Sequence, residues 1–256
     1  MTAVTVRAHR EGAACVLTVD RPTRKNSLDP ATLAALGDAA RALAGDVTVR
    51  AVVLTGAPSA GVFLSGGDLQ ALVDVRTADE ARAMASTAHA AVDALRALGV
   101  PLVAAVNGDA FGGGCELAAA CDYRVCDAGV RFHWVQARFA VTTGWGGASN
   151  LVDLVARGTA VRWLLAGRAV PVDEALAAGF ADEVVPAGTC VARAVAFAAE
   201  VAQHPREASS RMLTLLRESG RMGRGDARAL ELREFGEAWS TDDHHAAVAR
   251  FLSRAR

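Results

Sequence analysis

A run of three glycines followed by a glutamate gives this chain its clearest potential for chemistry. Gly112, Gly113 and Gly114 lead into an apolar helical segment, and Glu116 lies in the first turn of that segment. Because glycine has no Cβ, a ligand can approach its backbone N–H closely, and N–H groups at a helix N-terminus lack intrahelical partners. The aligned peptide dipoles add partial positive charge there. The segment therefore predicts a site for an oxygen that becomes negative during a reaction.

The elements that must position this site begin with strands. Short runs rich in Val, Leu and aromatic residues predict strands over 4–8, 14–20, 51–56, 102–106, 123–126 and 131–134, with a further strand-like run at 182–185. Helical patterns fall between them over 30–44, where Asp29 is the expected N-cap, and over 78–98. Beyond Gly146 the pattern is almost entirely helical, over 148–155, 160–166, 172–178, 188–204, 205–218, 226–240 and 242–254. This order predicts an α/β core followed by a helical C-terminal region.

The composition narrows the class of protein. The chain has 256 residues, 52% of them hydrophobic, and a formal net charge of -1. A net charge this close to zero gives no excess of positive charge to attract nucleic acid or an anionic membrane surface, so we do not expect these partners. Small-molecule ligands are favoured instead. The charged N-terminal segment and the lack of a long apolar run favour a cytoplasmic protein. The five cysteines include no C-x-x-C pair, so we expect buried reduced thiols and no metal site.

A second glycine motif lies upstream, in Phe63-Leu64-Ser65-Gly66-Gly67-Asp68-Leu69. Together with the run at 112–118 it resembles the crotonase (enoyl-CoA hydratase/isomerase) family. The resemblance covers nearly the whole chain, through 17–22 with Asn26, 52–56, 101–107, 121–122, 175–179 and 241–243. It implies a crotonase-like (ClpP/crotonase) α/β fold: a spiral of ββα units over 1–190, with a helical C-terminal oligomerisation region over 191–256. It also implies assembly as a homotrimer or hexamer.

The resemblance further implies an enzyme of acyl-CoA thioesters that needs no cofactor beyond the CoA moiety of its substrate. Its oxyanion hole falls on the backbone N–H groups of Gly67 and Gly113, and its first catalytic glutamate falls on Glu116. A thioester carbonyl polarised in such a hole collects charge as an enolate, and losing one donor costs about 2.7–4 kcal/mol. The structural alternatives are a tight turn at Gly67, a close-packed helix start at Gly113 and a helix-stabilising charge at Glu116.

The chain departs from the hydratases of the family at Gln136, where they carry a second catalytic glutamate. An amide forms hydrogen bonds but does not exchange a proton at neutral pH, so Gln136 is expected to orient water or a substrate group. We expect a hydratase or isomerase in which Glu116 alone moves the proton. One alternative is a decarboxylase of a malonyl-type ester such as methylmalonyl-CoA or ethylmalonyl-CoA, which needs no general base. The other is a non-catalytic CoA-ester binder.

The same resemblance assigns further residues to the site. Contacts to CoA are expected from Arg24, Lys25, Ser65, Gly66, Asp68, Leu69 and Arg254. The acyl pocket is expected to include His89, Trp134, Phe139 and Trp145. A helix histidine at the surface or in the core is the alternative for His89. Crowded aromatic side chains favour a compact acyl group, or an aromatic one that stacks. Thr241 and Asp242 predict a helix N-cap, which argues against a metal site over 242–245.

Overall fold

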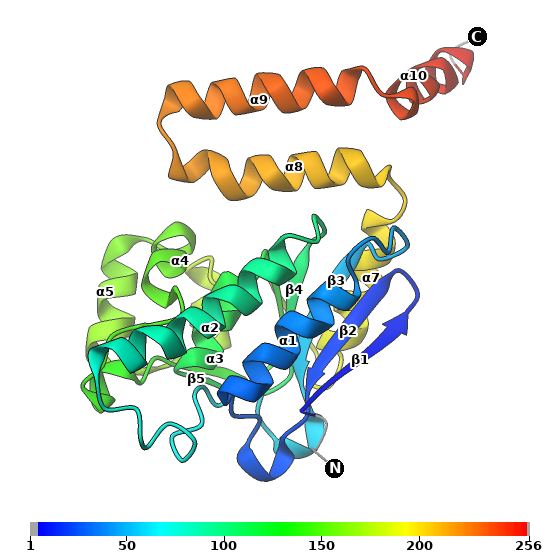
Figure 1. Ribbon diagram of the computed structural model, residues 1–256. Helices are drawn as coiled ribbons and strands as arrows, with labels where there is room; N and C mark the ends of the chain where they lie inside the picture. Colours follow the sequence, from blue (N-terminus) through cyan, green and yellow to red (C-terminus); the bar gives the residue numbers. More distant parts are fainter. Residues whose placement is uncertain (1–4, 255–256) are drawn as a thin grey trace. The chain divides into compact units, whose positions relative to one another are not determined.

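The computed structural model describes residues 5–254 and divides into two compact units, one ending at Ala199 and the other starting at Glu200. The first unit carries the strands and the helices around them, and the second is helical (Figure 1). The expected boundary at residue 190 coincides with the first residue of helix α7 (Cys190–Val201). Because Cys190, Ala194 and Ala198 pack into the core of the first unit, nearly all of α7 belongs to that unit.

A six-stranded sheet organises the first unit. Its strands follow the order β1 (Val6–Glu11), β2 (Ala14–Val19), β3 (Ala51–Gly56), β4 (Leu102–Val106), β6 (Tyr123–Asp127) and β9 (Glu183–Val185). β1 and β2 pair antiparallel, and the other neighbouring pairs are parallel. A smaller sheet joins β5 (Ala110–Phe111), β7 (Arg131–His133) and β8 (Ala169–Pro171), with β7 in the middle.

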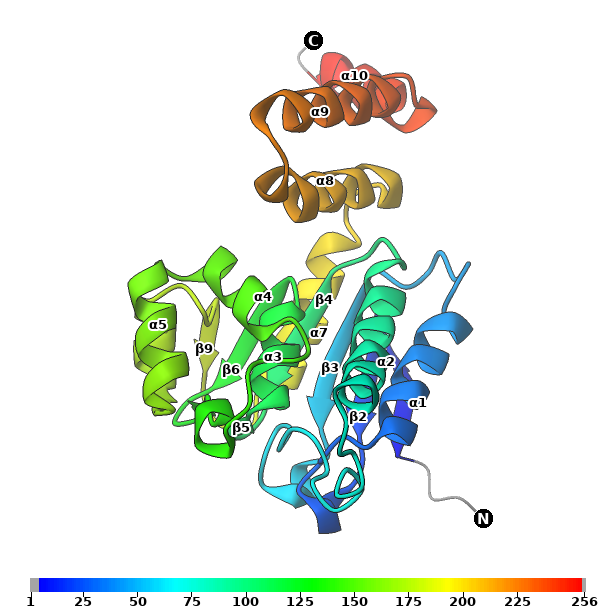
Figure 2. The same ribbon diagram turned by 60° about the vertical axis from the view of Figure 1, so that its left-hand side comes forward.

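Helices cover both faces of the large sheet, which is why its central strands are apolar along their whole length. Val16, Val53 and Val103 share one face and pack with α7. Leu17 and Leu54 point to the opposite face. There the core is completed by α1 (Pro30–Ala42), α2 (Ala78–Arg96) and α3 (Gly113–Ala120), which lie together in front of the sheet in Figure 2.

The remaining helices of the first unit are α4 (Gly147–Leu154), α5 (Arg157–Ala166) and α6 (Val172–Ala177). The second unit contains α8 (Arg206–Glu218), α9 (Arg224–Trp239) and α10 (Asp242–Arg254). Within it, Arg211 of α8 forms an ion pair of 2.9 Å with Glu234 of α9. None of the described helices is both long enough and apolar enough to cross a membrane.

The order of the predicted elements and the α/β class are confirmed. Asp29 caps α1 by accepting a hydrogen bond from Thr32 N at 2.7 Å, as expected. The first strand, predicted over 4–8, extends instead to Glu11, because its exposed polar end pairs with β2; Val4 lies outside the described residues. Strands β5 and β8 were not predicted from the sequence, because runs of two or three residues show no periodicity.

All five cysteines are free and buried, as the sequence predicts. Burial raises the pKa of the Cys126 thiol to about 12, and it also raises the pKa of Cys115 well above its ordinary value. These thiols therefore stay protonated at neutral pH, where the thiolate is the reactive form.

Candidate active site

Two loops lie side by side where β3 and β4 end, and each carries one glycine motif. Phe111 N donates to Leu64 O at 2.9 Å, which joins the loops. Gly66 brings them closest: its φ is +86°, and a Cβ there would lie 3.0 Å from Gly113 N and 2.9 Å from Phe111 O. Glycine alone tolerates both the left-handed backbone and this approach. The local sequence therefore places the two motifs against each other.

The backbone N–H groups of Gly67 and Gly113 have no protein partner among residues 5–254. On one loop, Leu28 N donates to Gly66 O at 2.8 Å and Asp68 N donates to Leu28 O at 3.1 Å, a pattern that skips Gly67 N. On the other loop, Gly113 is the first residue of α3, so its N–H lies outside the intrahelical bonds. Both glycines line one cavity. Two unpaired backbone donors in one cavity are what an oxyanion hole requires.

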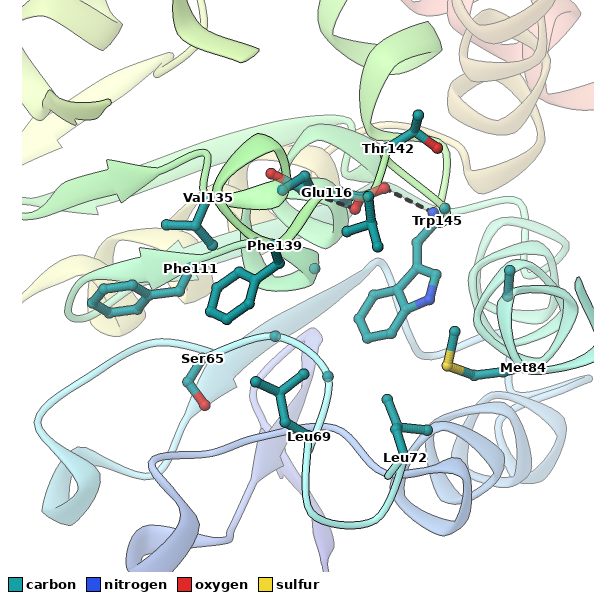
Figure 3. A pocket seen from close by; sticks show the side chains of 18 of the residues that line it. Ser65, Leu69, Leu72, Met84, Phe111, Glu116, Val135, Phe139, Thr142 and Trp145 are labelled. Atoms are coloured by element: carbon teal, nitrogen blue, oxygen red, sulfur yellow. Dashed lines mark hydrogen bonds between the residues drawn. The ribbon is translucent and has the colours of Figure 1, made fainter. Parts of the chain in front are cut away.

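Glu116 lies beside these donors with both carboxylate oxygens occupied. It is 3% exposed. Its Oε1 accepts from Gln136 Nε2 at 2.9 Å, and its Oε2 accepts from Trp145 N at 2.7 Å and Gly147 N at 2.9 Å. Figure 3 shows the carboxylate at the cavity wall, with its hydrogen bond to the backbone of Trp145 drawn as a dashed line. The loop before α4 thus supplies two backbone donors that fix the glutamate.

The carboxylate of Glu116 determines which atom of the Gln136 amide faces it. A carboxylate oxygen only accepts, so the nitrogen of the amide must be the atom that faces it. The other amide atom, Oε1, is buried and has no hydrogen-bond partner among the described residues. An unpaired buried acceptor costs about 1–3 kcal/mol. Gln136 therefore holds Glu116 at the expense of one unsatisfied acceptor.

Gly147 allows the close contact between its loop and Glu116. A Cβ at this position would lie 2.8 Å from both Cδ and Oε2 of Glu116. We expect Gly147→Ala to displace the carboxylate and to lower kcat about 100-fold. Gly158→Ala is the matched control, because Gly158 also lies in the first turn of a helix and a Cβ there meets nothing within 4 Å. Steady-state kinetics on both variants tests this, and equal activity would contradict the contact.

A partly buried ionic cluster holds the loop that carries Gly67. Arg21 binds Asp29 Oδ2 at 2.8 Å and Asp68 Oδ2 at 2.9 Å. The guanidinium also donates to Ser27 O at 2.6 Å. Asp68 directly follows Gly67, so this cluster ties the backbone of Gly67 to the segment after β2.

Asp68 makes the stability of this cluster depend on pH. Burial raises the pKa of Asp68, but hydrogen bonds from Arg21, Ala71 N and Ser27 outweigh burial and hold the pKa below its ordinary value. A lowered pKa stabilises the fold above the ordinary pKa of about 3.9, and this stabilisation is lost as the pH falls through the folded-state value.

We therefore expect Asp68→Asn to lower the free energy of unfolding by roughly 1.5–3 kcal/mol at neutral pH, and by less at about pH 3. Urea unfolding at the two pH values measures the difference. The exposed Asp38 provides the control variant Asp38→Asn, which should have little effect at either pH. A loss for Asp68→Asn that is equally large at both pH values would contradict the ionic role.

The cavity shared by these groups has a volume of about 1180 Å³. Its walls come from both glycine loops, from α2 and from the segment 135–145. Figure 3 shows that mainly apolar side chains project into it. They include Val62, Leu69, Leu72, Met84, Phe111, Val135, Phe139, Val141 and Trp145. Such a lining suits an apolar ligand with a few polar anchoring points.

Most of the residues predicted from the sequence meet at this cavity. All four proposed catalytic residues line it, namely Gly67, Gly113, Glu116 and Gln136. So do six of the proposed binding residues: Lys25, Ser65, Gly66, Leu69, Phe139 and Trp145.

The other predicted site residues lie elsewhere. Trp134 is fully buried in the core, edge-on to Phe180 with ring centroids 5.8 Å apart. His89 does not line the cavity, but its Nε2 donates to the backbone oxygen of Gly144, a lining residue, at 3.1 Å. Arg24 hydrogen-bonds to the side chain of Gln70, and Asp68 belongs to the ionic cluster. Arg254 is the last described residue of α10, in the second unit.

Sequence reasoning missed Gly147, and it missed that the backbone of Trp145 supports Glu116. Gly147 and the backbone of Trp145 hold the carboxylate, yet Gly147 is separated from Glu116 by 31 positions. The sequence does carry a signal for this loop. The cluster Gly144-Trp145-Gly146-Gly147 leads into a helix, as the run Gly112-Gly113-Gly114 does. For Leu72 and Met84, by contrast, nothing in the sequence distinguishes a residue that lines a cavity from any other apolar residue.

A family model described as enoyl-CoA hydratase/isomerase matches residues 9–256. The chain therefore belongs to the enoyl-CoA hydratase/isomerase (crotonase) family, which acts on acyl-CoA, and it has the crotonase fold. Members of this family generally use no cofactor. Among the described residues, no group of three or more His, Cys, Asp or Glu side chains is placed to hold a metal ion.

Individual relatives cover almost the entire chain. A short-chain-enoyl-CoA hydratase from Clostridium acetobutylicum is 30% identical over 96% of this chain and 94% of its own length. A 2,3-dehydroadipyl-CoA hydratase from Escherichia coli is also 30% identical, with the same coverage. Among solved structures, an enoyl-CoA hydratase from Mycobacterium smegmatis superimposes with a TM-score of 0.92 and 26% identity, over 98% of this chain and 97% of that one.

Proposed function

We propose that this chain is an enoyl-CoA hydratase/isomerase-type lyase that binds its thioester oxygen with the N–H groups of Gly67 and Gly113. Glu116 moves the proton. The observation that carries this proposal is the meeting, in a single cavity, of two backbone donors without a partner in the described part of the chain and one buried carboxylate that accepts three hydrogen bonds. The two hydratases named above support the reaction type, and their different acyl groups leave the acyl group of this chain open.

The hydrogen bonds of Glu116 indicate which of its oxygens transfers the proton. Oε2 already accepts two backbone bonds, whereas Oε1 accepts one bond from Gln136 Nε2. A carboxylate oxygen has two lone pairs, so Oε1 keeps one for a proton. Gln136 acts as a positioning residue that fixes Oε1 beside the bound thioester. The CoA moiety is expected to contact Lys25, Ser65 and Leu69 along the same cavity.

Incubation of the purified protein with crotonyl-CoA and with a 3-enoyl-CoA in D₂O tests the proposal. Mass spectrometry should detect water addition or double-bond migration, with deuterium entering at the carbon that gains a proton. The same assay should include methylmalonyl-CoA and ethylmalonyl-CoA. If an acyl-CoA binds but no thioester is turned over or deuterated, the chain is a CoA-ester binder and the proposal is wrong.

A decarboxylase of a malonyl-type CoA ester is the second candidate, and the three donors already bound to Glu116 favour it. Decarboxylation breaks the C–C bond to the substrate carboxylate, and its electron pair passes to the thioester oxygen as an enolate. The hole stabilises that enolate, solvent protonates its carbon, and no base is needed. Release of CO₂ from methylmalonyl-CoA or ethylmalonyl-CoA without hydration of crotonyl-CoA would select this candidate.

We also propose that the helical region over 191–256 mediates self-association as a trimer or hexamer. Several of its large apolar side chains are exposed in the single chain, among them Leu216 at 80%, Phe251 at 72% and Leu232 at 63%. Exposed apolar groups gathered in one small unit favour burial against another surface. Light scattering coupled to size-exclusion chromatography measures the assembly, and a monomer at micromolar concentration would contradict it.

A further inference from the structure

The indole N–H of Trp145 is a hydrogen-bond donor that is open to the cavity. Trp145 lines the cavity, and its Nε1 forms no hydrogen bond within residues 5–254. The Nε1 atom of Trp134 also lacks a partner there but is enclosed, whereas that of Trp145 is not among the enclosed atoms. Figure 3 shows the indole nitrogen of Trp145 on the side of the ring that faces Met84. Because an indole N–H in a ring that is only 7% exposed normally has a partner, the expected acceptor is a ligand.

The ring also places this donor relative to the proposed hole. A Cβ on Gly67 would lie 3.8 Å from Cζ2 of the indole, and a Cβ on Gly113 would lie 2.8 Å from Cη2. These two ring carbons therefore border the hole, and Nε1 lies beyond them, on the far side of Cε2. A thioester oxygen that accepts from both glycine N–H groups puts the reacting carbons beside this edge. The indole N–H then meets the acyl group further along its chain.

Helix α2 brings a cation to the same wall of the cavity. Arg82 and Ala85 both line it. With His89 they follow the spacing i, i+3 and i+7, so the three share one face of the helix. That face packs on the loop that carries Trp145, since a Cβ on Gly144 would lie 3.8 Å from the Cβ of Ala85 and His89 Nε2 donates to Gly144 O at 3.1 Å. Arg82 thus lies one helical turn from the contact beside Trp145.

Positive charge predominates among the described side chains around the cavity. Three of them are basic, namely Lys25, Arg82 and Arg138, and Glu116 is the acidic one. The carboxylate of Glu116 already accepts three hydrogen bonds. Arg82 pairs with Asp79, but the two side chains are 72% and 90% exposed, and an ion pair this exposed contributes little. Arg82 can therefore exchange Asp79 for an anionic ligand at small cost.

We propose that the acyl group of the substrate ends in a free carboxylate, which accepts from Trp145 Nε1 and pairs with Arg82. This inference rests on the proposed function, because it places the thioester oxygen at Gly67 and Gly113. A carboxylate end gives the indole N–H its missing acceptor, whereas an alkyl end would displace water from that N–H without replacing the hydrogen bond. The substrate class is therefore a CoA thioester of a dicarboxylic acid, with one carboxyl group in the thioester and the other free.

Binding of matched saturated thioesters tests this inference without catalysis. Adipyl-CoA and hexanoyl-CoA have equally long acyl chains that end in a carboxylate and a methyl group, and glutaryl-CoA and pentanoyl-CoA repeat the comparison one carbon shorter. Calorimetry should show that the wild type binds the carboxylate member of at least one pair about tenfold more tightly. Trp145→Phe removes the indole N–H but keeps an aromatic ring and the backbone N–H that holds Glu116. This variant and Arg82→Met should each lower the ratio several-fold.

Arg41→Met is the matched control for Arg82→Met. Arg41 also pairs with an aspartate at the spacing i, i+3 on an exposed helix face, and it does not line the cavity. The variant should therefore keep the wild-type ratio. Trp163→Phe is the control for Trp145→Phe, because Trp163 is fully buried outside the cavity lining.

Nuclear magnetic resonance tests the hydrogen bond itself. The chain has four tryptophans, each with one indole N–H signal, and the signal missing from Trp145→Phe belongs to Trp145. Adipyl-CoA should move the proton of this signal downfield, as a new acceptor does, and hexanoyl-CoA should not. Equal shifts with the two thioesters would overturn the proposed bond.

The outcomes separate this inference from the proposed function. A wild type that hydrates crotonyl-CoA but binds both members of each pair equally overturns the carboxylate alone. A ratio that falls in Trp145→Phe but not in Arg82→Met overturns the ion pair and points to a neutral acceptor. If Trp145→Phe fails to fold, Arg82→Met decides, because its side chain is exposed on α2. A preference for adipyl-CoA without turnover of any thioester supports the inference and contradicts the proposed reaction, and failure to bind any acyl-CoA overturns both.

Discussion

Glu116→Gln should slow hydration or double-bond migration by about 10²–10⁴-fold while leaving the fold intact, because an amide does not take up the proton. The surroundings accommodate this change. The new amide oxygen can accept from Trp145 N and Gly147 N, as Oε2 does now. Its NH₂ group then faces Gln136, whose Oε1 has no partner among residues 5–254 and becomes an acceptor once that amide turns over. The variant therefore keeps hydrogen-bond partners on both side-chain atoms of residue 116, so its loss of activity reports on proton transfer.

Thermal unfolding and rapid kinetics together test this expectation. The melting temperature should stay close to that of the wild type, and the thioester should still bind. A hydration rate equal to that of the wild type would show that Glu116 does not transfer the proton. Loss of hydration together with undiminished CO₂ release from methylmalonyl-CoA would assign the activity to the decarboxylase candidate.

Gln136→Glu should raise the rate of crotonyl-CoA hydration about tenfold or more. It places a second carboxyl group where the amide nitrogen now lies, 2.9 Å from Glu116 Oε1. Two carboxyl groups this close share one proton, so one can act as acid while the other acts as base. Gln136→Met is the matched control, because it keeps the length of the side chain but carries no exchangeable proton. An equal gain in both variants would mean that space, and not a second proton carrier, limits the rate.

The Gln136→Glu variant should also acquire a pH-dependent stability. Repulsion between the two carboxylates raises the pKa of the pair, so the variant is stable while the shared proton is present. The sign follows from linkage: a raised folded-state pKa gives stability at low pH that is lost as the pH rises through it. Thermal unfolding across the pH range should therefore show the variant falling below the wild type toward alkaline pH. Parallel profiles for the two proteins would contradict a shared proton.

The sequence predicts those parts of the site whose residues lie within one helical turn of each other. Gly113 and Glu116 lie within one helical turn, so their types and spacing alone predict an anion site with a carboxylate nearby. Asp29 is similar, because a helix cap acts over three residues. The pairing of Gly67 with Gly113 required a resemblance, since only the folded chain brings the two loops so close that a Cβ on Gly66 would lie 3.0 Å from Gly113 N.

Side-chain direction was the part that sequence did not determine. Trp134 and Trp145 are both aromatic residues of the same segment, and both were expected to line the acyl pocket. Trp134 follows the short strand β7 and turns into the core against Phe180, whereas Trp145 projects from a loop onto the two glycines. Strand β7 is held by β5 and β8, which are too short to show a pattern. Which tryptophan faces the ligand therefore depends on pairing that no local signal encodes.

The buried cysteines make this protein convenient for site-specific labelling. Since all five native thiols are enclosed, and burial raises the pKa of Cys126 to about 12, maleimide reagents at neutral pH should leave them untouched. A cysteine introduced at Leu69, which is 62% exposed on the rim of the cavity, would then be the thiol that reacts. A fluorophore attached there would change its emission as an acyl-CoA enters, and ligand entry could be followed in real time without removing a single native cysteine.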